Sequence, residues 1–239
     1  MNEKETIKFY DGESTYYTLK RYEIPMIDFT QFYFRKRLAI VLKYIREATN
    51  EKKGLDLLEV GCADGIVIRK IEKEFPRVFK KLVGTDISSG MIVEAKKRNA
   101  SASASFFLRG EENQEDRYDI VLEVGFLTTP ILENELLFVA NALKKDGYFI
   151  CSLSLKDSLR MKLKSKDDSY VNTHYGPVEY EKLLNRHFTI MKKEAYGIFI
   201  PYLWKAPSIA RVLQPFFEMV LKPFFSSFFH ENIYLVQKK

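Results

Sequence analysis

The chain has 239 residues and a formal net charge of +6 at pH 7, with 46% hydrophobic and 29% charged residues. This composition is typical of a globular protein of one domain, and the two cysteines, Cys62 and Cys151, are too few for a disulfide framework and lack metal-ligand spacing. Acidic residues interrupt the lysine-rich stretches, which favours a solvated surface over a nucleic-acid groove. The charged first residues do not resemble a secretory signal, and no run of about 18 uncharged apolar residues is present, so we expect a cytoplasmic protein without a spanning helix.

The first part of the chain divides into an arm and a helix. Residues 1–30 are polar and rich in tyrosine and show no clear period, so we expect an irregular arm. Residues 31–48 place Phe34, Leu38 and Ile45 at helical spacing, which predicts a helix.

From residue 55 onward, apolar strands alternate with helices. Asp64 stands at the start of the first helix of this series and Ser88 or Ser89 at the start of the second, so we expect these side chains to cap them. Such alternation produces right-handed βαβ units and a parallel sheet covered by helices on both faces. The predicted strands are 55–60, 81–87, 103–108, 118–124 and 147–155, and the predicted helices are 64–75, 89–99 and 134–146.

The second half of the chain is less regular. Its apolar and aromatic segment 201–229 is expected to be helical but broken by Pro207, Pro215 and Pro223. The other predicted elements are a polar connection at 156–176, a short helix at 177–187 with Pro177 in its first turn, a long strand at 188–200 and a closing strand at 231–239.

The stretch LLEVGCADG, residues 57–65, joins an apolar strand to a helix through two glycines. Such a turn lets a ligand approach the backbone beside the positive end of a helix. The spacing from Gly61 to Gly65 departs from the dinucleotide pattern G-x-G-x-x-G, whose third glycine would fall at Ile66. No G-K-[ST] follows, which excludes a P-loop.

The same stretch resembles motif I of the class I S-adenosylmethionine-dependent methyltransferases, E/D-x-G-x-G-x-G. Glu59, Gly61 and Gly65 match this motif, and Ala63 stands in place of the middle glycine. LVGTDIS resembles motif II, with Asp86 ending the second strand 25 residues after Gly61. FFLRGEE resembles the end of the third strand, DIVLEVGFL resembles motif IV, and LKKDGYFICSLS resembles the fifth strand with its entry.

The resemblance implies one methyltransferase domain with an α/β, Rossmann-like fold, in which helices cover both faces of a seven-stranded, mostly parallel sheet with an antiparallel last strand and the order 3-2-1-4-5-7-6. Residues 1–50 would form the N-terminal arm and helix, 54–154 the cofactor-binding half, and 155–239 the acceptor half. The implied cofactor is S-adenosyl-L-methionine, with Asp86 accepting hydrogen bonds from both ribose hydroxyls. The residues implied to contact it are Glu59, Gly61, Cys62, Ala63, Gly65, Asp86, Ile87, Met91, Gly110, Glu111, Glu112, Glu123, Val124 and Arg37.

The acceptor side carries fewer signals. A sulfonium methyl group is already electrophilic, so the protein mainly positions a nucleophile, and a base helps when the acceptor is a hydroxyl or a thiol. Glu123 near the end of the fourth strand and His174 after the fifth are the candidate catalytic residues. Their alternatives are a hydrogen-bond acceptor at the pocket edge and a surface-loop histidine. Arg37, with Tyr16 or Tyr17, is a candidate contact to the cofactor's carboxylate.

Two further features bear on the class of acceptor. EVGFLTTP stands where amino methyltransferases of nucleic acid or protein glutamine carry D/N-P-P-Y/F, which makes those acceptors less favoured. Glu123 stands nearly alone as an acid there, so we expect no metal.

These features together predict a methyltransferase that acts on a small molecule, with transfer to oxygen favoured and a glycan or lipid-linked intermediate as the acceptor. The alternatives are a nucleic-acid or protein methyltransferase and a non-catalytic regulatory protein that binds S-adenosylmethionine. The segment 201–229 is expected to form a helical cap over the acceptor pocket. A dimer contact and a helix lying in a membrane interface are its other interpretations, so a monomer and a homodimer are both retained.

Overall fold

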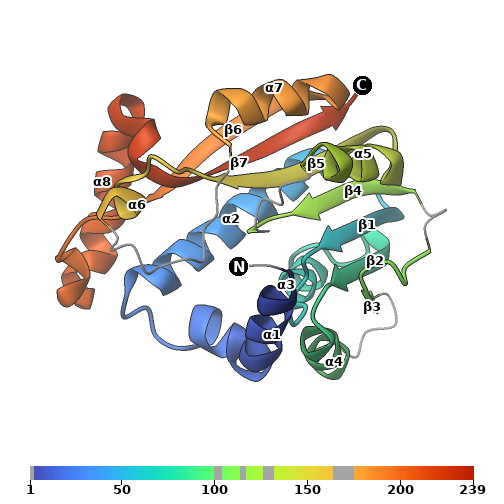
Figure 1. The fold of residues 1–239 in the computed structure, drawn as a ribbon, viewed down its shortest axis with the longest axis horizontal. Coiled ribbons are helices and arrows are strands. Elements are labelled where there is room, and N and C mark those ends of the chain that lie inside the picture. The colour runs from blue at the N-terminus through green and yellow to red at the C-terminus, as the bar shows by residue number, and fades with distance from the viewer. Residues whose placement is uncertain (1–2, 100–103, 114–116, 126–131, 164–174) are drawn as a thin grey trace.

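The computed structural model describes residues 3–99, 104–113, 117–125, 132–163 and 175–239, and it contains one sheet of seven strands (Figure 1). The strand order is β3-β2-β1-β4-β5-β7-β6, as predicted. The first five strands in this order pair in parallel, whereas β7 is antiparallel to both of its neighbours. The strands are β1 (Leu55–Val60), β2 (Phe79–Asp86), β3 (Ala104–Leu108), β4 (Tyr118–Glu123), β5 (Leu143–Ser154), β6 (Phe188–Ile198) and β7 (Phe229–Lys238).

Helices cover both faces of this sheet, and each face has its own apolar core. All six residues of β1 are buried, as expected for a strand that is covered on both sides. One core packs α2, α3 and α4 against the sheet, and the other packs α5 and α7. The helices are α1 (Glu3–Glu13), α2 (Phe29–Thr49), α3 (Ile66–Glu74), α4 (Ser89–Arg98), α5 (Leu132–Ala142), α6 (Leu159–Leu163), α7 (Pro177–His187) and α8 (Pro207–Phe225).

The N-terminal arm is more ordered than the sequence predicts. It contains α1, a 3₁₀ turn η1 (Ser14–Tyr16) and a π-helical turn η2 (Leu19–Glu23). Asp11 fastens the arm to α4, because its Oδ1 accepts hydrogen bonds from Ser88 Oγ at 2.5 Å and from the Gly90 N–H at 3.0 Å. The expectation of an irregular arm is therefore wrong: tertiary contacts with α4 support a helix whose own sequence lacks a clear apolar period.

The two predicted helix caps have different outcomes. Ser88 caps α4, since its Oγ accepts a hydrogen bond from the Met91 N–H at 3.1 Å. Asp64 does not cap α3, because Gly65 occupies the N-cap position in the left-handed conformation. The Asp64 carboxylate points back to the arm, where it accepts hydrogen bonds from Thr18 Oγ1 at 2.7 Å and from the Thr18 N–H at 3.2 Å.

The helix α8 is continuous, in contrast to the predicted breaks. It runs for 19 residues through Pro215 and Pro223, with Pro207 in its first turn. It lies beyond the ends of β6 and β7, at the outer end of the molecule (Figure 1). Two 3₁₀ turns flank it, η3 (Leu203–Lys205) and η4 (Ser226–Phe228). Among the helices of the described residues, none is long and apolar enough to cross a membrane.

Candidate cofactor and active site

The turn between β1 and α3 has an unusual backbone. Gly61, Ala63 and Gly65 have φ angles of 75°, 48° and 76°, in the left-handed region that disfavours a side chain. The N–H groups of Gly61 and Cys62 donate to the carbonyl oxygen of Thr85 at 2.8 and 2.9 Å, which holds the turn against β2. Ala63 is in a strained conformation that glycine would adopt more favourably. The backbone of the turn is open to a ligand.

Asp86 lies at the end of β2, beside this turn. Its Oδ2 accepts the Ala63 N–H and its Oδ1 accepts the Ser88 N–H, both at 2.9 Å, and the residue is buried. Burial raises the pKa of the Asp86 carboxyl group, although the N–H groups of Ser88 and Ala63 favour its charged form. Each carboxylate oxygen can accept a second hydrogen bond, so a ligand hydroxyl over the turn has an acceptor available.

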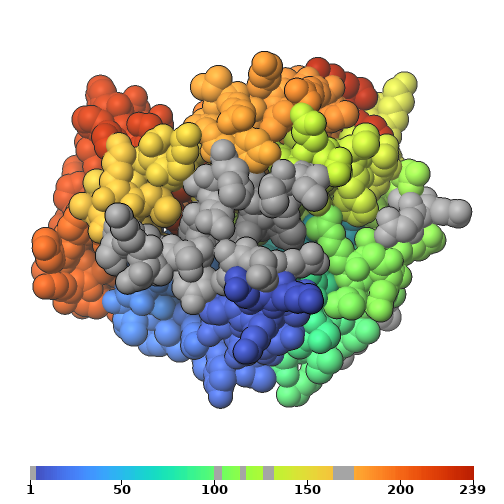
Figure 2. All heavy atoms as spheres, in the orientation of Figure 1, coloured from blue at the N-terminus to red at the C-terminus, as the bar shows by residue number. Residues whose placement is uncertain are grey.

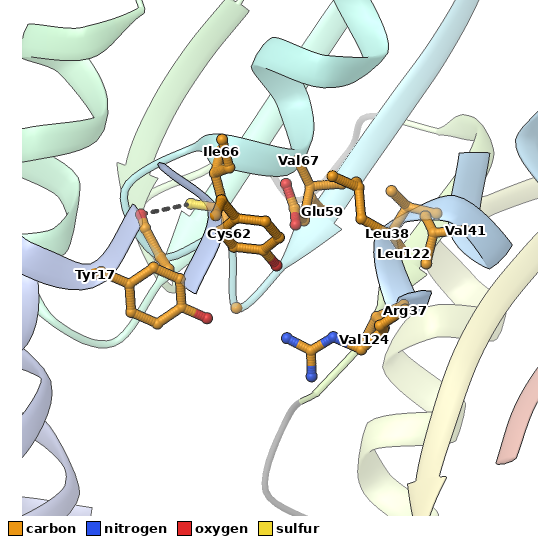
Figure 3. A pocket seen from close by; sticks show the side chains of 13 residues that line it. Tyr17, Arg37, Leu38, Val41, Glu59, Cys62, Ile66, Val67, Leu122 and Val124 are labelled. Atoms are coloured by element: carbon orange, nitrogen blue, oxygen red, sulfur yellow. Dashed lines mark hydrogen bonds between the residues drawn. The ribbon is translucent and has the colours of Figure 1, made fainter. Parts of the chain in front are cut away.

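A pocket opens in front of the turn and contains one acidic and one basic side chain (Figure 3). Glu59 is buried on β1, and its Oε2 has no hydrogen-bond partner in the described structure. Burial, with the nearby charge of Asp86, raises the pKa of Glu59 well above its usual range. The buried Arg37 reaches the same pocket from α2, with its guanidinium carbon 4.5 Å from the centroid of the Phe34 ring.

Tyrosines from the arm and apolar residues from α2 complete the wall. Tyr17 and Tyr22 line the pocket, whereas Tyr16 is exposed, so of the two tyrosines proposed to accompany Arg37 the structure brings Tyr17 to the site. Burial raises the pKa of Tyr10 to about 12, and the nearby charge of Asp86 acts in the same direction. Tyr10 and Tyr22 were not predicted to be site residues, although the tyrosine-rich composition of the arm was a signal that pointed to them. Leu38 and Val41 of α2, also not predicted as site residues, line the pocket as well.

The remaining predicted cofactor contacts on this side of the sheet gather around Asp86. The Arg109 N–H donates to the carbonyl oxygen of Asp86 at 2.9 Å, which brings the end of β3 beside it. There the Gly110 N–H donates to Glu112 Oε2 at 2.6 Å, while Glu111 is exposed. Met91 is fully buried at the start of α4, Ile87 directly follows Asp86, and Cys62 and Ala63 line the pocket.

Glu123 lies apart from the pocket. Leu122 and Val124 line the pocket, and because side chains alternate along a strand, Glu123 faces the opposite side of β4. There burial and the nearby carboxylate of Glu135 raise the pKa of Glu123 to about 8, while Arg109 opposes the shift. A cofactor or catalytic contact of Glu123 stays a prediction. His174 lies outside the described residues, and no group of three or more metal-ligating side chains occurs among the residues that are described.

A family model described as a methyltransferase domain matches residues 31–197 of the chain. The chain belongs to the class I S-adenosylmethionine-dependent methyltransferases. The match covers nearly all of the segment from α2 to β6, which includes the turn, Asp86 and every pocket residue except Tyr17 and Tyr22 of the arm. The cofactor of this protein is S-adenosylmethionine.

Solved structures show the same fold at low sequence identity. Magnesium protoporphyrin IX methyltransferase from Synechocystis PCC 6803, solved with bound S-adenosylhomocysteine, is 14% identical, with 100% of each chain covered and a TM-score of 0.67. The [4+2]-cyclase SpnF is 13% identical, with 98% of this chain and 94% of SpnF covered and a TM-score of 0.65. A methyltransferase from Haloferax volcanii, solved with the Trm112 methyltransferase activator, is 13% identical, with 96% of each chain covered and a TM-score of 0.60. A comparison with curated protein sequences found no match to this chain.

Proposed function

We propose that this methyltransferase acts on a small-molecule acceptor, with oxygen favoured as the methylated atom. The observation that carries the proposal is the pocket that holds Glu59 and Arg37 between the β1–α3 turn and the tyrosines of the arm. Arm, helix and strand residues surround this cofactor pocket, and an acceptor has to reach the methyl group past them, which suits a compact molecule better than a nucleic-acid duplex. A glycan or lipid-linked intermediate is the acceptor class we favour.

The residues of the pocket fit the charges of S-adenosylmethionine. The unpartnered Oε2 of Glu59 suits a cationic group, and the Arg37 guanidinium suits a carboxylate. Asp86 offers acceptor positions for the ribose hydroxyls, as the family resemblance implies. When bound, the cofactor supplies an activated methyl group. The chain orients that group and excludes water, and Tyr17 and Tyr22 cover the pocket.

A direct test follows transfer of an isotope-labelled methyl group. Purified protein is incubated with labelled S-adenosylmethionine and a cell extract, which is then separated into lipid, small polar molecules, protein and nucleic acid. We expect label in the lipid or small-molecule fraction, and none with an Asp86→Asn variant as a matched control. Label in the nucleic-acid or protein fraction would establish the rival methyltransferase instead.

The same experiment separates catalysis from binding alone. SpnF, which has this fold, is a cyclase, so the fold by itself does not establish methyl transfer. Calorimetry that detects S-adenosylmethionine binding, combined with no labelled product from any fraction, would favour the non-catalytic alternative.

A further inference from the structure

The helix α8 exposes an apolar side and buries two polar side chains. The buried residues of α8 are Ala210, Gln214 and Glu218. This is the reverse of a surface helix in a globular protein, whose apolar stripe faces the core. Six large apolar side chains that are 43–78% exposed share the outer side at spacings of three and four residues: Ile209, Val212, Phe216, Met219, Val220 and Phe224.

Hydrogen bonds fix α8 in this orientation. Glu218 Oε1 accepts the N–H groups of Gly197 and Ile198 at 2.8 and 3.3 Å. Gln214 Nε2 donates to the carbonyl oxygen of Ile198 at 2.7 Å, and its Oε1 accepts from Trp204 Nε1 at 3.2 Å. Turning the rings inward would leave these backbone groups at the end of β6 without partners and would bring no equivalent bonds. The exposed apolar side is therefore built into the fold.

The charged side chains of this segment are basic where they are accessible. The basic residues of the segment 201–229 are Lys205, Arg211 and Lys222, and its one acidic residue, Glu218, is buried. Lys222 pairs with Glu194 at 3.2 Å, whereas Lys205 and Arg211 are exposed. An apolar helix face flanked by cations has the charge and polarity of a helix that lies in an anionic membrane interface.

Residues next to α8 add further exposed apolar and basic side chains to this surface. Tyr202 is 77% exposed, with the Lys205 ammonium 4.8 Å from its ring centroid. On α6, Leu163 is exposed, and the adjacent Lys162 ammonium lies 5.0 Å from the centroid of the Phe228 ring. Amphipathic tyrosine and lysine side chains of this kind are typical at the boundary between headgroups and water.

The charge of the region favours a bilayer over a second copy of the chain. The helix α8 lies at the end of the molecule, where the space-filling view shows orange and red atoms at its left border (Figures 1 and 2). Self-association through this face would pair apolar side chains but would supply no counter-charge to Lys205 and Arg211, whereas anionic lipid supplies both an apolar layer and the counter-charge. We propose that α8 docks the protein on the surface of a membrane that contains anionic lipid, with its exposed apolar side at the level of the headgroups and the first acyl carbons.

The test uses the complete chain and vesicles of two compositions: phosphatidylcholine alone, and phosphatidylcholine with an equal amount of phosphatidylglycerol. Flotation measures the fraction of the protein that is bound to the vesicles. We expect binding to the anionic vesicles and weaker binding to the neutral ones. Lys205→Ala should lower anionic binding by about fivefold, since one cation near such a surface contributes about 1 kcal/mol.

A matched pair of variants locates the contact. Val212→Ser combined with Phe224→Ser should lower vesicle binding by at least about tenfold. Val178→Ser, at an 83% exposed position of α7, should leave it unchanged. The thermal unfolding of all three proteins should agree closely, because the substituted side chains are exposed. Absence of wild-type binding to anionic vesicles, or equal binding by the double variant, would overturn the proposal. A concentration-dependent dimer that the double variant abolishes would identify a second copy as the occupant and would also overturn it.

Discussion

The carboxylate of Asp86 is the group whose removal tests the cofactor site most directly. In the structure its two oxygens accept the N–H groups of Ala63 and Ser88, both at 2.9 Å. The family resemblance adds the ribose hydroxyls of S-adenosylmethionine as donors to the same oxygens. Asp86→Ala removes these acceptors, and each charge-assisted hydrogen bond contributes about 1.5–3 kcal/mol. The dissociation constant of S-adenosylmethionine should therefore rise by about tenfold at least.

The same substitution also affects folding, so affinity and stability must be measured together. Losing two bonds to backbone N–H groups should lower the free energy of unfolding by about 1–3 kcal/mol, because the cost of burying the carboxylate offsets part of their contribution. In a protein of this size the midpoint of thermal unfolding would fall by about 2–12 °C. Calorimetric titration below that midpoint isolates the affinity.

Asp56, at the amino end of β1 and therefore far from the turn, provides a matched control. Asp56 is also buried, and it pairs with Lys144 at 2.9 Å and with Lys80 at 3.4 Å, at the amino end of the strand. Asp56→Ala should lower stability and leave the dissociation constant unchanged. A folded Asp86→Ala protein that binds S-adenosylmethionine as tightly as the wild type would refute the assignment of Asp86.

Three further predictions concern the turn, Glu123 and metal dependence. Gly61→Ala, at φ 75°, should weaken S-adenosylmethionine binding by at least about tenfold. Gly54→Ala, at φ 71° with no atom within 4 Å of the added Cβ, should cost about 1–2 kcal/mol of stability and leave affinity intact; equal affinities of the two variants would move the site away from the turn. Because the folded pKa of Glu123 lies above its unfolded value, the folded state holds more protons and stability falls as pH rises from about 4.5 to about 8. Denaturant titrations should show Glu123→Gln gaining about 1–3 kcal/mol on the wild type across that range, and a difference that does not change with pH would contradict the shift. Methyl transfer should persist in the presence of a chelator, and activity that is lost and then restored by magnesium would assign a metal to the reaction.

The strand order and the place of the pocket could be predicted because they depend on local patterns. Strands such as β1 are apolar on both faces, and the turn at Gly61 and Gly65 follows directly in the sequence. Ser88 caps α4 through an N–H three residues along the chain, which a local pattern can indicate. The structure confirms these elements within a few residues.

The features that the sequence could not predict depend on contacts between distant parts of the chain. Asp64 bonds to Thr18, 46 residues earlier, so its position before a helix gave a misleading prediction of a cap. The helix α1 depends on Asp11 meeting the start of α4, 77 residues later. The side of β4 that Glu123 faces depends on which residues pack on each face of the sheet. No periodicity within one segment reveals these partners, because they are set by the fold as a whole.

The orientation of α8 shows most clearly why an apolar pattern alone does not determine which side of a helix is buried. The apolar and aromatic segment 201–229 was expected to form a helical cap over the acceptor pocket, and that role stays a proposal. The end of β6 instead presents backbone groups at Gly197 and Ile198 that need hydrogen-bond partners, and Glu218 and Gln214 provide them. An unpaired backbone group in the interior costs about 1–3 kcal/mol, which is comparable to the gain from burying one ring. The polar side of α8 can therefore win the buried position, and the apolar side is left available for a membrane surface.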